Sequence, residues 1–200
     1  MMNFYWDKQY DKAFTIFEAL SKQNHAGAQN CLGICYERGW GAERNEAKAL
    51  EWYGKSAAQG YAKAFCNLGK YYEQEATWKY AGTKFKEKEH EEDANYKKAL
   101  ELMDKAIQLG DEANACWYLS MYYEGGNTAK KDMAKSFEYA KRGAELGNAE
   151  LQLKVGHYYE EGKGVKKDYA KAAQWFQKAL DNGDERGKSF LDDLRKKKKI

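Results

Sequence analysis

The sequence predicts an all-α fold in which stacked pairs of helices form one elongated solenoid. One residue pattern recurs about every 36 positions along the 200 residues. Periods of this size are typical of helical pairs that bury a core only against their neighbours. The chain has no proline and is rich in Ala, Lys, Glu, Leu and Tyr, which favours helices. Glycines that end helices, and Asn or Asp residues that begin them, recur at the same place in each repeat.

The charge and hydropathy patterns exclude two classes of partner. The net charge is only +3, with acids and bases interspersed, so we expect no nucleic-acid binding. No apolar run approaches the length of about 18 residues that a membrane-spanning helix needs, so we expect no membrane span. The basic run Arg195 to Lys199 is expected to be a plain helix end, where cations suit the helix dipole.

The repeats set the predicted organisation of the chain. The first and fourth repeats align without a gap at a separation of 123 residues, as Gly33 with Gly156. The second repeat begins in register and then loses it through a 14-residue insertion between Glu75 and Asn95. We therefore divide one solenoid over residues 1–200 into an N-terminal half-repeat (9–24), repeat 1 (26–60), repeat 2 (61–110, with the insertion near 76–93), repeat 3 (111–147), repeat 4 (148–183), a capping helix (184–195) and a basic tail (196–200).

Four positions in each repeat have a predicted structural role. A small residue lets the partner helix approach each first helix closely, at Gly33, Gly69, Ser120 and Gly156. The second helices are expected to begin at the N-caps Asn45, Asn95, Asp132 and Asp168. Left-handed residues are expected to end the first helices at Gly39, Gly126 and Gly162. The second helices should end in the same way at Asn24, Gly60, Gly110, Gly147 and Gly183.

The fourth repeat resembles the Sel1-like repeat, a relative of the tetratricopeptide repeat. It runs Val155-Gly-His-Tyr-Tyr-Glu-Glu-Gly-Lys-Gly-Val-Lys-Lys-Asp-Tyr-Ala-Lys-Ala-Ala-Gln-Trp-Phe-Gln-Lys-Ala179. The resemblance covers about residues 9–195, although repeat 2 lacks the Gly-x-Gly turn and repeat 3 has Thr128 at its second turn glycine. It implies a right-handed α-solenoid of helical hairpins and a bacterial, non-enzymatic adaptor that binds a protein or peptide partner in its concave groove.

Tetratricopeptide geometry, if it transfers, selects the residues that point into this groove. They lie two positions before, and two and six after, the Leu or Val of each first helix. The partner-binding residues selected in this way are Asn30, Ile34, Arg38, Lys70, Gln74, Trp117, Met121, Leu153 and His157; Cys66, Gly125 and Glu161 occupy the same slots. Apolar anchors mixed with polar groups suit a peptide groove. The alternative is that these side chains pack against a neighbouring helix or face water.

The insertion between Ala76 and Asp93 is a second candidate contact surface. Insertions in repeat arrays tend to fall on one face and to carry function. Trp78, Tyr80 and Phe85 are its candidate contact residues. The alternative is a pair of lengthened helices whose Lys and Glu residues form a solvated face.

The sequence predicts no metal, cofactor or catalytic site. Cys31 and Cys35 lie one helical turn apart, but no further His or Cys has a spacing that would complete a metal site. The three histidines are scattered and lack a nucleophilic partner. The glycine-rich run at 162–167 lacks P-loop spacing and is interpreted as a turn.

Two alternatives to the adaptor remain open at this point. One is an immunity or inhibitor protein that blocks a toxin. The other is a β-lactamase-like hydrolase, as claimed for cysteine-rich relatives, whose paired cysteines this chain lacks. The N-terminus has no apolar signal segment, which favours the cytoplasm; the periplasm or secretion is the alternative if a signal peptide was removed. The sequence predicts neither the partner's identity nor the oligomeric state.

Overall fold

A computed structural model describes residues 3–80, 93–110, 112–125 and 131–200. Within these ranges the chain is helical and contains no strand. The helices are α1 (Asn3–Lys22), α2 (Ala26–Arg38), α3 (Glu46–Ala58), α4 (Ala62–Tyr80), α6 (Ala94–Gln108), α7 (Glu112–Gly125), α8 (Met133–Glu145), α9 (Ala149–Glu161), α10 (Tyr169–Asp181) and α11 (Arg186–Lys196).

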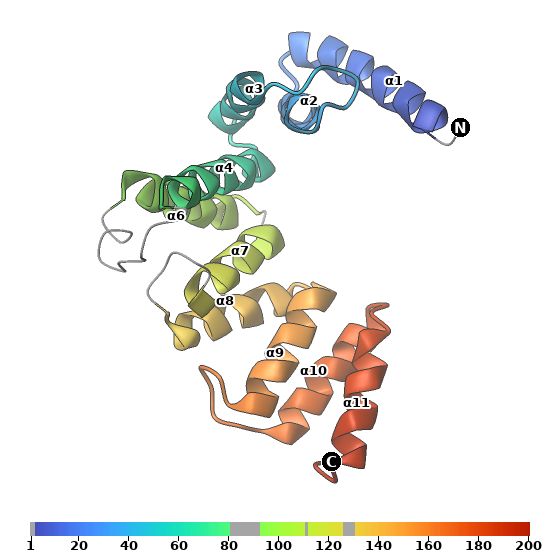
Figure 1. The fold of residues 1–200 in the computed structure, drawn as a ribbon, viewed down its shortest axis with the longest axis vertical. Coiled ribbons are helices and arrows are strands. Elements are labelled where there is room, and N and C mark those ends of the chain that lie inside the picture. Colours follow the sequence, from blue (N-terminus) through green and yellow to red (C-terminus); the bar gives the residue numbers. More distant parts are fainter. Residues whose placement is uncertain (1–2, 81–92, 111, 126–130) are drawn as a thin grey trace.

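The helices pack as pairs stacked one after another. The close pairs are α2 with α3, α4 with α6, α7 with α8, and α9 with α10. Successive pairs meet through α3 with α4, α6 with α7, and α8 with α9, while α1 and α11 pack on the outermost pairs. Figure 1 shows the array following a curved path, with the two termini at opposite ends of its long axis. The predicted all-α solenoid is confirmed.

The predicted close approach within each pair is also found. The Tyr53 ring of α3 lies so near Gly33 of α2 that a methyl group there would come within 2.6 Å of it. Gly156 of α9 stands equally close to the Phe176 ring of α10. Residues larger than glycine would force these helices apart, so the repeated small residue sets the spacing within the pair.

The turns after the second helices use left-handed residues, as predicted. The φ angle is 60° at Asn24 and lies at 79–99° at Gly60, Gly110, Gly147 and Gly183. Gly39 and Gly162 close α2 and α9 in the same conformation. Gly126 lies outside the described residues.

Three of the four predicted N-caps are found, and one is wrong. The side chains of Asn45, Asp132 and Asp168 each accept a hydrogen bond from the backbone N–H three residues further on. The N-cap of α6 is Asp93 rather than Asn95, and its carboxylate accepts a hydrogen bond of 2.8 Å from the Asn95 N–H. Asp93 is buried and its carboxylate also pairs with the Lys79 ammonium at 2.7 Å. A carboxylate held in this way suits the helix N-terminus better than an amide does, and it begins the helix earlier.

Candidate partner-binding groove

Three hollows follow one another along the first helices of the stacked pairs. The N-terminal hollow, of about 580 Å³, lies between α2, α3 and α4. The central hollow, of about 380 Å³, lies between α4, α6 and α7. The C-terminal hollow, of about 400 Å³, lies mainly between α7 and α9 and reaches α11. Tyr118 borders the first two hollows, while Trp117 and Met121 border the last two. We call this continuous row the groove.

The groove brings together eight of the nine partner-binding residues predicted from the repeat. The N-terminal hollow is lined by Ile34, Arg38, Lys70 and Gln74. Trp117 and Met121 line the other two hollows, and Leu153 and His157 line the C-terminal one. Asn30 lies outside the groove: it is buried, and its side-chain Oδ1 accepts a hydrogen bond of 2.9 Å from the side-chain amide of Asn67. That bond joins α2 to α4.

The three hollows differ in chemistry. The N-terminal hollow carries charges of both signs, including Arg38, Arg44 and Glu46. Within it, the Tyr53 hydroxyl donates a hydrogen bond of 2.5 Å to the Glu37 carboxylate. Burial, together with this bond, raises the pKa of Tyr53. The polar wall is therefore partly fixed before any partner arrives.

The C-terminal hollow is lined by both charged and apolar side chains, and some of the charged ones pair with other residues of the chain. The Lys154 ammonium lies 2.8 Å from the Glu124 carboxylate. The His157 ring packs edge-on against Phe190, with 4.5 Å between the ring centres, and its Nδ1 lies 3.3 Å from a Glu160 oxygen. His157 therefore helps to seat the final helix as well as lining the groove.

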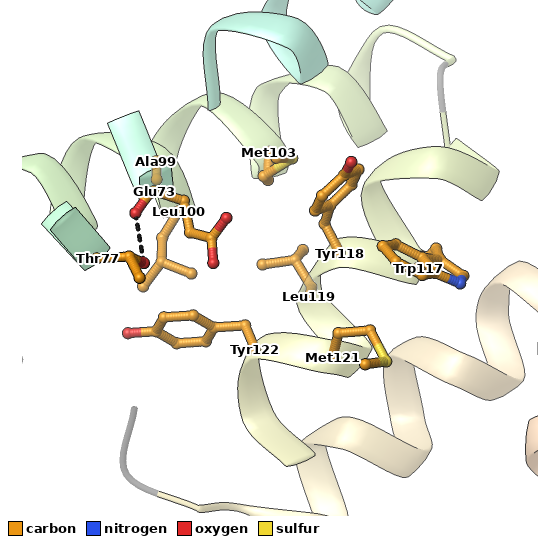
Figure 2. A pocket seen from close by; sticks show the side chains of 10 residues that line it. All are labelled: Glu73, Thr77, Ala99, Leu100, Met103, Trp117, Tyr118, Leu119, Met121 and Tyr122. Carbon is orange, nitrogen blue, oxygen red and sulfur yellow. Dashed lines mark hydrogen bonds between the residues drawn. The ribbon is translucent and has the colours of Figure 1, made fainter. Parts of the chain in front are cut away.

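The central hollow is the most apolar of the three. Its walls are Ala99, Leu100 and Met103 of α6 and the run Trp117 to Tyr122 of α7, apart from Ser120. Figure 2 shows one charged side chain among them, Glu73 of α4, with its carboxylate pointing into the hollow. Burial raises the pKa of Glu73. Thr77, one turn further on, donates its hydroxyl to the Glu73 carbonyl at 2.8 Å, a bond drawn in Figure 2.

The predicted insertion contacts are only partly described. α4 has 19 residues, whereas α2 and α9 have 13, so the insertion begins as added turns of helix. Trp78 lies on these turns and is 77% exposed. Tyr80 is the last residue of α4, but its side chain lies outside the described residues, as does the whole of Phe85.

The described ranges contain no grouping of three or more His, Cys, Asp or Glu side chains that could hold a metal ion. None of the four cysteines, all of which lie in the described ranges, forms a disulfide. Burial raises the pKa of the Cys35 thiol to about 11, so this thiol is not an activated nucleophile. None of the described helices is long and apolar enough to cross a membrane.

Comparison with known proteins assigns the family. The model of the Sel1 repeat matches residues 26–61, 75–111, 113–148 and 149–184, well over half of the chain. The chain belongs to the Sel1 repeat family. Sel1 repeats generally mediate protein–protein interactions, and their proteins are typically non-enzymatic scaffolds.

Several solved structures share the fold. A Sel1 repeat protein from Oxalobacter formigenes is 30% identical, with a TM-score of 0.66 over 92% of this chain and 67% of that one. The protective antigen c5321 of uropathogenic Escherichia coli is 28% identical, with a TM-score of 0.71 over 90% of this chain and 36% of that one. The immunity protein Pa5087 from Pseudomonas aeruginosa is 22% identical, with a TM-score of 0.58 over 89% and 60%, and so shows likeness of fold alone.

A putative Sel1-like repeat protein of Acanthamoeba polyphaga mimivirus is 40% identical over 68 residues. That stretch is 34% of this chain and spans only 13% of the viral protein's length. The relatives thus come from a virus as well as from bacteria, and a bacterial origin of this chain stays a prediction.

Sequence reasoning missed the residues of the central hollow that come from outside the selected slots, above all Glu73. The sequence nevertheless contains a feature that could have indicated Glu73. Glu73 and Thr77 lie four and eight residues after Gly69, on the stripe that faces α6. An acidic residue on a stripe that should be apolar marks a special position.

Proposed function

We propose that this protein is a non-enzymatic adaptor that holds an extended segment of a protein partner along the groove. The observation that carries the proposal is the continuity of the three hollows through Tyr118, Trp117 and Met121. Side chains selected by repeat position alone, on four different first helices, line this one surface. The Sel1 family's general role in protein interaction supports it.

The chemistry of the groove also supports a peptide ligand. Trp117 is half-buried and Met121 is 41% exposed at the junction of the central and C-terminal hollows. An aromatic and a flexible apolar side chain at the centre, with charged groups toward the ends, match the anatomy of a binding hot spot with a polar rim. A rigid repeat array loses little conformational entropy when it binds.

A photo-crosslinking amino acid introduced at position 121 tests the proposal. We expect it to capture a specific protein in the native cell extract, while the same group in place of Glu138, exposed on α8 outside the groove, captures none. The Trp117→Ala/Met121→Lys variant should lose the partner in a pull-down. Equal capture from positions 121 and 138, or full retention of the partner by the double variant, would refute groove binding.

We also propose that Trp78 contributes to the same partner, because a tryptophan this exposed on a lengthened helix has little role in the core. An immunity protein that blocks a toxin is the special case in which the partner is that toxin. The hydrolase alternative is tested by turnover of a panel of β-lactams, for which we expect none above the buffer rate.

A further inference from the structure

We propose that the central hollow is a specificity pocket for one basic side chain, a lysine or an arginine, of the bound partner, with Glu73 as its counter-ion. This assignment rests on the proposed function and names the chemistry that the groove selects. It follows from three features of the hollow: an unpaired carboxylate, apolar walls and aromatic rings.

The Glu73 carboxylate has no hydrogen-bond or ion-pair partner among the described residues. It nevertheless points into the hollow, toward Leu119 (Figure 2). A desolvated charge without a partner is unfavourable, and its pKa is raised by burial alone. A ligand cation would supply the missing partner in a place where water screens the attraction only partly.

The walls suit the rest of a basic side chain. Leu100, Met103 and Leu119 provide apolar surface on which an aliphatic stem can pack. Tyr118 and Tyr122 add ring faces or edges near the carboxylate. One of these rings already contacts a cation, because the Lys70 ammonium lies 4.7 Å from the Tyr118 ring centre.

Lys70 does not fill this role for Glu73. Lys70 lines the N-terminal hollow rather than the central one, and its ammonium rests on Tyr118, which borders both. Burial is the cause of the raised Glu73 pKa, with no opposing cation. A purely apolar ligand side chain would leave the carboxylate desolvated, and an acidic one would be repelled, so a basic side chain fits best.

Methionine methyl NMR on the full chain tests the pocket directly. Met103 and Met121 line the hollow, and Met133 on α8 lies outside it as an internal reference. The probes are N-acetyl-lysine methylamide and its uncharged analogue N-acetyl-norleucine methylamide. We expect the lysine probe to shift Met103 and Met121 but not Met133, with an affinity about tenfold above that of the norleucine probe, as one charge-assisted hydrogen bond provides.

Two glutamate variants provide the matched comparison. Glu73→Gln should remove the preference for the lysine probe, and Glu75→Gln, an exposed acid on the same helix, should leave it intact. Equal shifts by both probes, or an undiminished preference in Glu73→Gln, would overturn the pocket assignment. Because Gln keeps the shape of Glu, an unchanged methyl spectrum of the free variant verifies that it is folded.

An array of peptides with lysine, arginine, norleucine or glutamate at a fixed central position separates this assignment from the proposed function. Enrichment of lysine and arginine that disappears in Glu73→Gln supports both. Peptide binding without a preference for basic residues refutes the pocket assignment but still supports the proposed adaptor function. A charge-dependent response of Met103 and Met121 to the lysine probe, with no peptide bound, supports the pocket and refutes peptide binding along the groove.

Discussion

The Lys70 ammonium of α4 lies 4.7 Å from the ring centre of Tyr118 of α7, across the boundary between two stacked pairs. This cation–π contact separates the N-terminal hollow from the central one. Lys70 thus has a partner on Tyr118, whereas the Glu73 carboxylate has none within the part of the chain that the structure describes. The division of charge between these neighbouring hollows follows from this placement.

We expect Gly156→Ala to destabilise the protein by about 1–3 kcal/mol, because the added methyl meets the Phe176 ring inside the α9–α10 pair. Urea unfolding measures the change. Gly54→Ala is the matched control on α3, where an added methyl meets nothing within 4 Å. Alanine there should stabilise by roughly 0.5–1 kcal/mol, since glycine is the poorer helix former. Loss of stability in both variants would contradict this account of the small-residue position.

Asp93→Ala should destabilise the protein by about 1–3 kcal/mol, because it removes the N-cap of α6 and the ion pair with Lys79. Asn95→Ala, at the position that the repeat register selected, should change the unfolding free energy by less than about 0.5 kcal/mol. Urea unfolding of the two variants side by side distinguishes the caps. If Asn95→Ala lowered the unfolding free energy as much as Asp93→Ala does, Asn95 rather than Asp93 would be the N-cap.

We expect the stability of Glu73→Gln relative to the parent to increase as the pH rises from about 4 to 7. Burial raises the folded-state pKa of Glu73 above its unfolded value. Its contribution is therefore fully present below the unfolded pKa and lost as the pH rises through the folded pKa. Partial exposure limits the effect to a melting-temperature difference of about 2 °C in a chain of this size.

Melting curves of both proteins across this range provide the measurement for Glu73. Among the described residues that line the hollow, the other titratable side chains are Tyr118 and Tyr122, and burial raises the pKa of Tyr118. The exposed Glu75→Gln variant is the control on the same helix. A Glu73→Gln difference that falls with increasing pH would have the wrong sign.

Trp78→Ala should leave stability within about 0.5 kcal/mol of the parent, because the side chain is 77% exposed. Trp175→Ala, at a buried core position of α10, should lose about 3–5 kcal/mol. Calorimetry on both variants checks the contrast. A large loss of unfolding free energy in Trp78→Ala would mean that Trp78 packs in the core. It would contradict the proposed role of Trp78 in partner binding.

The features that depend on local backbone geometry could be predicted from the sequence. Left-handed turns at Gly60 and Gly183 follow from the freedom of glycine at positive φ, whatever surrounds them. Asn45 and Asp168 cap helices through contacts three residues away. The α6 cap could not be placed in this way, because the register was carried across an insertion and local sequence offers both an Asp and an Asn.

The sequence predicts which face of each first helix lines the groove, but not every residue that does so. Helical periodicity places Ile34 and Met121 on one face, and the structure finds both in the groove. Asn30 has the same periodicity, but a hydrogen bond from Asn67 on another helix buries it, and no local pattern encodes that pairing. Glu73 was missed because the positions selected from the repeat, counted from Leu68, are 66, 70 and 74 and do not include it.

The position of the central hollow has a mechanical consequence. It spans the joint at which the α4–α6 pair meets α7, and the main contacts between pairs of described helices run from each pair to the next along the chain. A ligand side chain bound there contacts both the α4–α6 pair and α7, and so holds the two in one relative orientation. By linkage, whichever curvature of the array binds the ligand most tightly is favoured by occupancy, and a partner that imposes that curvature elsewhere raises the affinity for the ligand by the same factor.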